Sequence, residues 1–234
     1  MSRPSNYAAV FFDLDGTFAD TAPDLAAAAN SLRIDRGFDP LPLERLRPMA
    51  SHGARGMLGE ALGLCPDDSA YGATVEVFLQ RYEAALCVQT KVFDGIWDLV
   101  DAIEAQGLVW GIVTNKAMRF AAPLCRALGV DGRAVAVVGG DTTPHAKPHP
   151  APLLHAAELA RLAPEGCIYV GDDLRDVQAG RAAGMRTVAV EWGYNGKAEP
   201  PSAWGADDVV ATPRALMQRF GWSVPAAAGS GMGG

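Results

Sequence analysis

The sequence lacks any long hydrophobic segment. No apolar run in its 234 residues approaches the ~20 residues that a transmembrane helix needs. Residues 1–7 contain one arginine and no apolar stretch typical of a signal peptide, and Asp13 ends the apolar run that begins at Ala8. We therefore expect a cytoplasmic protein without a membrane partner.

Cysteine and histidine are also scarce. The four cysteines lie far apart and form no C-x-x-C pair, which argues against a disulfide framework and predicts free thiols in a reducing compartment. The four histidines offer no better metal site. Prolines flank His149 on both sides, and no cysteine or aspartate completes a zinc set with His145 and His155.

Basic residues are fewer than acidic ones. Lysine and arginine total 20 against 27 aspartates and glutamates, giving a formal net charge of −7 without a basic cluster. Nucleic acid is therefore not expected as a partner, although a local site can still bind an anion. The hydrophobic fraction of 49% excludes a wholly disordered chain, and the length allows one large domain, with or without an insertion.

Short apolar runs alternate with helical patterns such as Ile96–Gln106 and Phe120–Leu128. The runs are continuous, as expected of parallel strands covered on both faces, so the pattern predicts an α/β fold with helices flanking a parallel sheet. The predicted strands are Ala8–Phe12, Val109–Val113, Val135–Val138, Ile168–Val170 and Thr187–Val190.

One interval of almost a hundred residues, between the first and second predicted strands, has no strand pattern. It carries helical patterns instead, and a crossover needs only one helix, so we expect an inserted helical subdomain at residues 19–89. Residues 1–18 and 90–225 then form the core, and the small-residue tail 226–234 is predicted to be disordered. The helical patterns of the insertion are Pro23–Arg36, Leu43–Met49, Arg55–Leu62 and Ser69–Leu86.

Two carboxylates leave the end of the first strand in the motif D-L-D-G-T, at Asp13 and Asp15. Open α/β sheets bind ligands at the carboxyl ends of their strands. Unpaired carboxylates buried in a core would be costly, so this pattern indicates a site. The alternative is an ordinary turn, since aspartate and glycine are common turn formers.

A second acidic motif, G-D-D-L-R-D, follows the predicted strand that ends at Val170. If the two strands are neighbours, Asp13, Asp15 and Asp172 converge, and like charges so close require a cation. Ligands that are all oxygen favour Mg²⁺. The alternative is that Asp172 or Asp173 caps the following helix.

Two weaker motifs complete the set. Thr114, Asn115 and Lys116 follow another strand, where a hydroxyl and backbone amides suit a phosphate oxygen. Lys147 precedes a proline, and its ammonium could neutralise the carboxylates. Each of these motifs is commonplace alone.

The four motifs, in this order and each at a strand end, resemble those of the haloacid dehalogenase superfamily across the whole chain except the tail. The resemblance implies a Rossmann-like core, and the insertion resembles the helical cap of the phosphoglycolate-phosphatase-like branch. It implies a Mg²⁺-dependent phosphatase that acts on a small phosphorylated metabolite, as a monomer or homodimer.

The resemblance also implies a role for each motif residue. Asp13 would be the nucleophile that forms an aspartyl-phosphate, and Asp15 would be the general acid and base. Thr114, Asn115 and Lys147 would hold the phosphoryl group. The metal would be bound by Asp13, the Asp15 carbonyl and Asp172, supported by Asp173 or Asp176.

The insertion is expected to select the leaving group through the loop Ser51–Gly56, with His52, Gly53 and Arg55 contacting substrate. The alternative is that Arg55 only opens a surface helix. Several further stretches resemble the N-acetylmuramic acid 6-phosphate phosphatases of peptidoglycan recycling, and this is the substrate we expect. These stretches are Asp35–Gly37, Gly53–Arg55, Trp110–Lys116, Arg119–Ala121 and Trp204–Asp207.

Other functions share parts of this pattern. Phosphoglycolate phosphatase, another small-metabolite phosphatase and a sugar phosphomutase would share the whole core. A hydrolytic dehalogenase would lack the second aspartate of the first motif, so Asp15 argues against it. An inactive binding or switch protein is a different class, and the filled catalytic positions argue against that class.

Overall fold

A parallel β-sheet forms the centre of the protein. The computed structural model describes residues 7–195 and 199–224, so the predicted tail 226–234 lies outside it. The fold class predicted from the sequence is confirmed. The six strands are all parallel and follow in space the order β5 (Ala136–Val138), β4 (Val109–Val113), β1 (Ala9–Phe12), β6 (Cys167–Gly171), β7 (Arg186–Val190) and β8 (Asp208–Val210).

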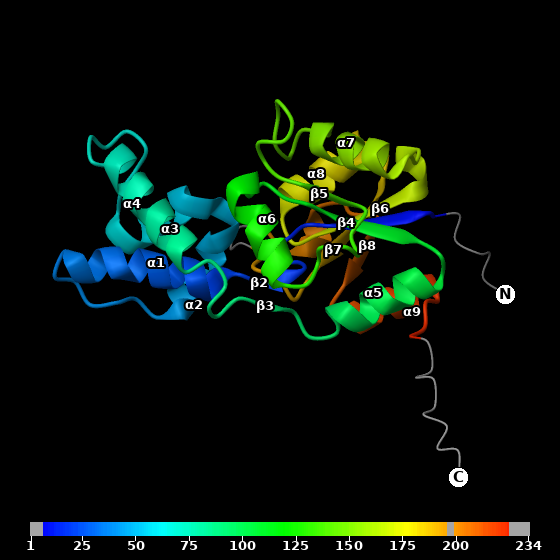
Figure 1. Ribbon diagram of the computed structural model, residues 1–234, viewed down its shortest axis with the longest axis horizontal. Helices are drawn as coiled ribbons and strands as arrows, with labels where there is room; N and C mark the ends of the chain where they lie inside the picture. Colours follow the sequence, from blue (N-terminus) through cyan, green and yellow to red (C-terminus); the bar gives the residue numbers. More distant parts are fainter. Residues whose placement is uncertain (1–6, 196–198, 225–234) are drawn as a thin grey trace, which may run out of the picture.

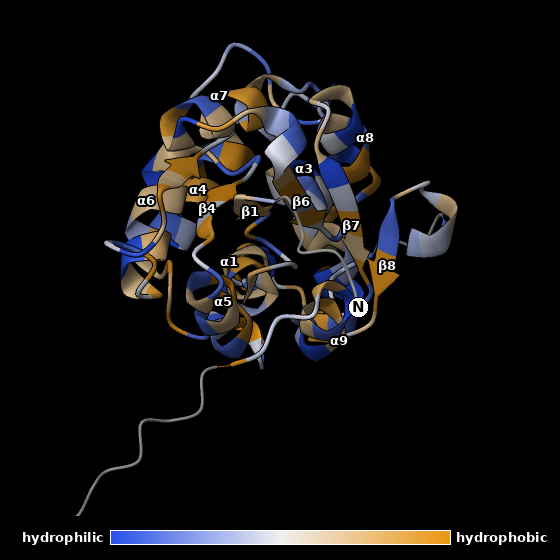
Figure 2. Ribbon diagram, turned by 90° about the vertical axis from the view of Figure 1, so that its right-hand side faces the viewer, coloured by the Kyte–Doolittle hydropathy of each residue, from blue (hydrophilic) through white to orange (hydrophobic). Residues whose placement is uncertain are grey.

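Helices cover both faces of this sheet, α7 and α8 on one side and α5 and α9 on the other, as Figures 1 and 2 show. Side chains of successive β1 residues point to opposite faces. Phe11 therefore packs with α7 and α8, whereas Phe12 packs with α5, α6 and α9. Burial on both sides explains why the strands read as continuous apolar runs. The helices are α5 (Ile96–Ala105), α6 (Met118–Ala127), α7 (Ala151–Ala160), α8 (Leu174–Ala182) and α9 (Pro213–Phe220).

The helical insertion lies to one side of the core, at the left of Figure 1. We call it the cap. Its helices are α1 (Ala22–Asp35), α2 (Leu43–Leu46), α3 (Gly53–Leu62) and α4 (Tyr71–Ala84), with a 3-10 helix over Arg47–His52. The predicted helix Leu43–Met49 changes to 3-10 geometry at Arg47, because Pro48 has no backbone N–H to continue the α-helical ladder.

The expectation that no strand lies between the first two predicted strands is wrong. β2 (Ala19–Asp20) pairs antiparallel with β3 (Lys91–Val92). Each strand has only two residues, which is too short for an apolar pattern to show. The pair stands where the chain enters and leaves the cap, while the cap boundaries at 19 and 89 stay a prediction.

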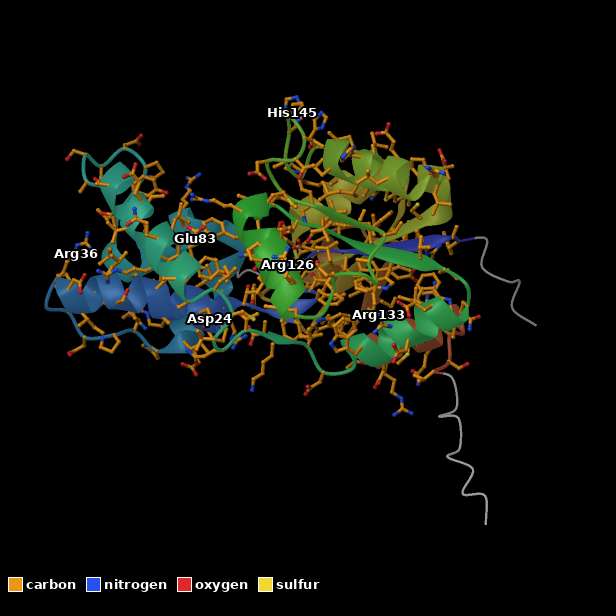
Figure 3. The ribbon with its side chains drawn as sticks, in the orientation of Figure 1. Asp24, Arg36, Glu83, Arg126, Arg133 and His145 are labelled. Atoms are coloured by element: carbon orange, nitrogen blue, oxygen red, sulfur yellow. The ribbon has the colours of Figure 1, made fainter. Side chains whose placement is uncertain are left out.

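The buried carboxylate of Asp24 fixes the return from cap to core. It accepts hydrogen bonds from the backbone N–H groups of residues 88–90 at 2.9–3.1 Å and from the Thr90 hydroxyl at 2.7 Å. Figure 3 labels Asp24 at the end of α1 that faces the core, with Arg36 at the distal end. A buried acid that satisfies three backbone donors holds this crossing in one conformation.

Two further sequence expectations concern the described part of the chain. The four cysteines are free thiols, with Cys125 and Cys167 buried and Cys65 exposed. None of the helices in residues 7–195 and 199–224 combines the length and apolar character needed to cross a membrane.

Candidate active site

The three central strands bring the sequence motifs together at one edge of the sheet. Phe12 is in register with Ile112 of β4 and with Val170 of β6. Asp13 therefore leaves β1 level with the last residues of its neighbours, and Thr114 and Asp172 follow one residue later. Between this edge and the cap lies a cavity of about 410 Å³, lined by residues from both parts.

Lys147 lies at the centre of the site with its side chain almost fully buried. Its ammonium is 2.9 Å from Asp13 Oδ1 and 2.7 Å from Asp176 Oδ1, and it donates to the Tyr169 hydroxyl at 2.7 Å. Burial lowers the pKa of Lys147, but the two carboxylates outweigh it and hold that pKa above its ordinary value. Lys147 is therefore a fixed positive charge beside Asp13.

Asn115 positions the segment that carries this lysine. Its side-chain amide donates to the Lys147 carbonyl at 2.9 Å and accepts from the Lys147 backbone N–H at 2.9 Å. Asn115 and Thr114 also line the cavity, and the Thr114 hydroxyl accepts from the Lys116 N–H at 3.1 Å. Direct contact of Asn115 with a ligand stays a prediction, whereas its support of Lys147 is visible.

Three carboxylates lie close together at this edge of the sheet. Oxygens of Asp13, Asp172 and Asp176 all lie within 4.8 Å of one another, the only candidate metal cluster of three such residues in the described chain. Burial raises the pKa of Asp13 to about 7, with Asp176 and Asp15 adding to the rise and Lys147 opposing it. Burial, with Asp13 and Asp176, also raises the pKa of Asp172.

This cluster fits a hard cation. Asp13 Oδ1 is buried without an aligned hydrogen bond from the described residues, although the Lys147 ammonium is near. Asp172 is held by the Thr17 hydroxyl and the Tyr194 N–H, each at 2.8 Å. A cation would relieve the repulsion among three carboxylates, and a donor set of oxygens alone suits Mg²⁺.

Gly16 explains why glycine follows the two aspartates of the first motif. Its φ is +89°, and a Cβ at this position would come 2.3 Å from Asp172 Oδ2. Only glycine allows both the left-handed backbone and this close approach of the two acidic loops.

Two aspartates of the second acidic motif, Asp173 and Asp176, make different contacts. Asp173 caps α8, accepting from the Arg175 N–H at 2.9 Å and pairing with the Arg175 guanidinium at 2.8 Å. Asp176 completes the capping box through the Asp173 N–H and also belongs to the metal cluster. The geometry therefore favours Asp176 over Asp173 as the carboxylate that supports the metal. Asp173 instead caps the helix, which is the alternative that the sequence left open.

Asp15 faces the cavity and is held from two sides. Lys116 Nζ lies 3.0 Å from Asp15 Oδ1, and the Thr21 hydroxyl donates to the same oxygen. Burial lowers the pKa of Lys116, but Asp15 and Tyr82 outweigh this effect and keep that pKa above its ordinary value. The metal contact predicted for the Asp15 carbonyl stays a prediction.

Two residues that line the cavity, Lys116 and Tyr82, were not predicted to belong to the site. Lys116 stands inside a quoted motif, but nothing in the sequence distinguishes it from an exposed lysine. Tyr82 of α4 also lines the cavity, and burial raises the pKa of its hydroxyl to about 12. No sequence signal connects Tyr82 to a site whose other residues lie in the core.

Of the three residues of the cap loop Ser51–Gly56 that were predicted to contact substrate, two line the cavity. His52 and Gly53 line the cavity, whereas Arg55 is exposed and lies outside its lining. Its position near the start of α3 matches the alternative of a surface helix, so substrate contact by Arg55 stays a prediction without geometric support. Arg175 instead ties core to cap, donating to the Ser51 carbonyl at 2.7 Å.

Comparisons with known proteins agree with this geometry. A family model described as haloacid dehalogenase-like hydrolase matches residues 10–190. The chain is 45% identical over 217 residues to a phosphoglycolate phosphatase of Xanthomonas campestris pv. campestris, covering 93% of this chain and 98% of that protein. It is 42% identical over 209 residues to an N-acetylmuramic acid 6-phosphate phosphatase of Pseudomonas aeruginosa, covering 89% and 92%. The crystal structure of a predicted phosphoglycolate phosphatase from Haemophilus somnus 129pt matches with a TM-score of 0.80 at 25% identity, covering 92% and 98%.

Proposed function

The chain belongs to the haloacid dehalogenase-like hydrolase family, and we propose that it is a Mg²⁺-dependent phosphomonoester hydrolase acting through an aspartyl-phosphate. The strongest support is the placement of Lys147, which lies 2.9 Å from Asp13 and 2.7 Å from Asp176 at the edge of the cavity. A buried cation at this place offsets the repulsion between a carboxylate nucleophile and a phosphoryl dianion.

Asp13 attacks phosphorus in the first step. A bond forms between its carboxylate oxygen and phosphorus, and the bond from phosphorus to the ester oxygen breaks. Bound by Asp13, Asp172 and Asp176, Mg²⁺ would supply Lewis-acid stabilisation of the phosphoryl oxygens. Lys147 and the Thr114 hydroxyl hold that group in line, which is most of what phosphoryl transfer requires.

Asp15 moves the protons. It gives a proton to the departing ester oxygen and later takes one from the water that hydrolyses the aspartyl-phosphate. Its place on the cavity wall, held by Lys116 and Thr21, suits a group that must reach the leaving oxygen. One residue can serve as acid and then base because hydrolysis is divided into two steps.

We propose 2-phosphoglycolate as the preferred substrate, in place of the N-acetylmuramic acid 6-phosphate expected from the sequence. The 45% identity to a phosphoglycolate phosphatase supports this choice slightly better than the 42% identity to the muramic acid enzyme. One observation favours the second candidate. A cavity of about 410 Å³ is of the size that encloses drug-sized ligands, and a phosphosugar fills it better than a two-carbon acid.

Phosphate release from a panel of phosphomonoesters tests the proposal. The panel contains 2-phosphoglycolate, N-acetylmuramic acid 6-phosphate, glucose 6-phosphate and p-nitrophenyl phosphate. We expect free phosphate in solution and the highest kcat/KM on 2-phosphoglycolate. A higher value on the muramic acid ester would replace the substrate, return of phosphate to the sugar would indicate a mutase, and no release from any ester would contradict the phosphatase assignment.

We expect Mg²⁺ to stabilise the protein and Ca²⁺ to inhibit it. Mg²⁺ relieves the crowding of Asp13, Asp172 and Asp176, so at about 100 times its Kd it should raise Tm by roughly 5–10 °C. Ca²⁺ takes more oxygen ligands at longer distances and would compete for the Asp13 oxygen that attacks phosphorus. Thermal melts and phosphate-release assays with each ion measure both effects. Full activity in excess chelator would contradict the metal assignment.

A further inference from the structure

Two hydroxyl groups in the cavity accept or donate no aligned hydrogen bond among the described residues, although the Lys116 ammonium lies near one of them. They belong to Tyr82 of α4 and Ser51 of the cap loop, and both side-chain oxygens are buried. Tyr82 is only 1% exposed, yet it lines the cavity. Buried polar groups are nearly always paired in native proteins, so unpaired hydroxyls on a cavity wall indicate a bound group that pairs with them.

Lys116 contacts both Tyr82 and Asp15, the proposed general acid and base. Its ammonium is 4.8 Å from the centre of the Tyr82 ring and 3.0 Å from Asp15 Oδ1, and its side chain is 8% exposed. It precedes α6, the core helix next to the cap in Figure 1. A buried ammonium on the cavity wall still has N–H groups to donate after its contact with Asp15.

We propose that Lys116 and Tyr82 form a subsite for a carboxylate carried by the leaving group of the substrate. The inference rests on the proposed function and deepens it. An ammonium and a neutral phenol both donate, and a carboxylate offers only acceptor oxygens, so the two sides are complementary. A neutral hydroxyl on the leaving group can also accept from both donors, but only a carboxylate adds its negative charge to these hydrogen bonds.

The position of Lys116 also limits how far this carboxylate lies from the ester oxygen. Asp15 must reach that oxygen to protonate it, and Lys116 contacts Asp15 directly. A carboxylate bound by Lys116 is therefore close to the ester oxygen. The 2-phosphorylated hydroxy acids, in which one carbon separates the two groups, meet this condition. Sugar phosphates with a carboxylate on a distant ring position do not.

A matched pair of substrates tests the subsite. 2-Phosphoglycolate and 2-hydroxyethyl phosphate differ only in the carboxylate, so the ratio of their kcat/KM values measures recognition of that group. Tyr82→Phe and Lys116→Met remove the proposed donors while keeping most of each side chain. Tyr71→Phe is the control, because Tyr71 begins the same helix but lies outside the cavity lining.

We expect the wild type to prefer 2-phosphoglycolate. Tyr82→Phe should lower the preference by roughly ten-fold and Lys116→Met by roughly a hundred-fold, mainly through a higher KM for 2-phosphoglycolate. Tyr71→Phe should leave the preference unchanged. Inhibition by glycolate, measured with p-nitrophenyl phosphate as substrate, should weaken in the first two variants only.

The outcomes separate the subsite from the proposed function. A wild type that prefers 2-phosphoglycolate, with both variants keeping that preference, overturns the subsite and leaves the function standing. Equal losses on both substrates also overturn it, because Lys116 would then act only through Asp15 or the fold. A wild type that hydrolyses p-nitrophenyl phosphate without preferring 2-phosphoglycolate overturns the choice of substrate, and the subsite with it.

Discussion

The Asp13→Asn variant is expected to lose phosphatase activity by roughly 10⁴-fold or more. An amide oxygen is a far poorer nucleophile than a carboxylate, and no other carboxylate takes its position. Asp15 is held by Lys116 and Thr21. Asp176 contacts Lys147 and forms part of the capping box at the N-terminus of α8. Phosphate release from 2-phosphoglycolate and p-nitrophenyl phosphate measures the loss, which should be equally complete on both.

The same variant is expected to be more stable than the wild type without metal. Burial raises the pKa of Asp13 to about 7, so the folded protein keeps a proton that the unfolded chain releases near pH 4. Wild-type stability therefore falls as pH rises from about 4 to about 7, and asparagine escapes this loss. Melting curves in chelator should show a larger advantage for the variant at pH 8 than at pH 5.

Asp67→Asn provides the matched control for both measurements, since Asp67 is exposed and lies outside the cavity lining. It should keep wild-type activity and show no gain in melting temperature at pH 8 comparable to that of Asp13→Asn. Substantial turnover by Asp13→Asn would remove Asp13 as the nucleophile. A metal-free variant less stable than the wild type at pH 8 would show that the ion pair with Lys147 outweighs the cost of burying the charge.

The core of the site could be predicted from the sequence because strand ends determine it. Continuous apolar runs mark β1, β4 and β6, and the residues that follow parallel neighbours must meet at one edge of the sheet. The observed register, with Phe12 level with Ile112 and Val170, brings about this meeting. The short strands β2, β3 and β8 were not predicted. β2 and β3 have two residues each, too few for a periodic pattern, and β8 begins with Asp208 and so has only two apolar residues.

The cap side of the site could not be predicted in the same way. Which face of a helix meets the cavity depends on how the cap packs on the core, and no local pattern records that packing. Arg55 looks suited to bind an anion but is exposed, whereas Tyr82 looks like a core residue and lines the cavity. Asp173 and Asp176 were likewise equivalent until the capping box of α8 separated their roles.

The contacts between cap and core explain why these missed residues bear on function. Phe120 and Tyr194 of the core pack into the hydrophobic cluster of the cap. The Tyr194 hydroxyl accepts from the Thr21 N–H at 2.7 Å, and the Tyr194 N–H donates to Asp172 at 2.8 Å. Tyr194 therefore contacts both the base of the cap and the metal cluster, and it fixes the position of the cap relative to the phosphoryl site.

The Asp15→Asn variant should slow both the formation and the hydrolysis of the aspartyl-phosphate, by roughly 10²–10⁴-fold. Asparagine keeps the shape of the side chain, but its amide cannot give or take the proton. The loss in the first step should depend on the leaving group. p-Nitrophenolate departs without protonation, whereas the alkoxide of 2-phosphoglycolate does not, so phosphoenzyme formation should suffer far less with p-nitrophenyl phosphate.

Rapid-mixing experiments separate the two steps. With p-nitrophenyl phosphate the variant should release a burst of one nitrophenol per enzyme and then turn over slowly, because the aspartyl-phosphate accumulates when no base activates water. With 2-phosphoglycolate no burst is expected, since the first step itself is slow. A uniform loss on both substrates, without a burst, would assign Asp15 a structural role through Lys116 and Thr21, which contact the same oxygen.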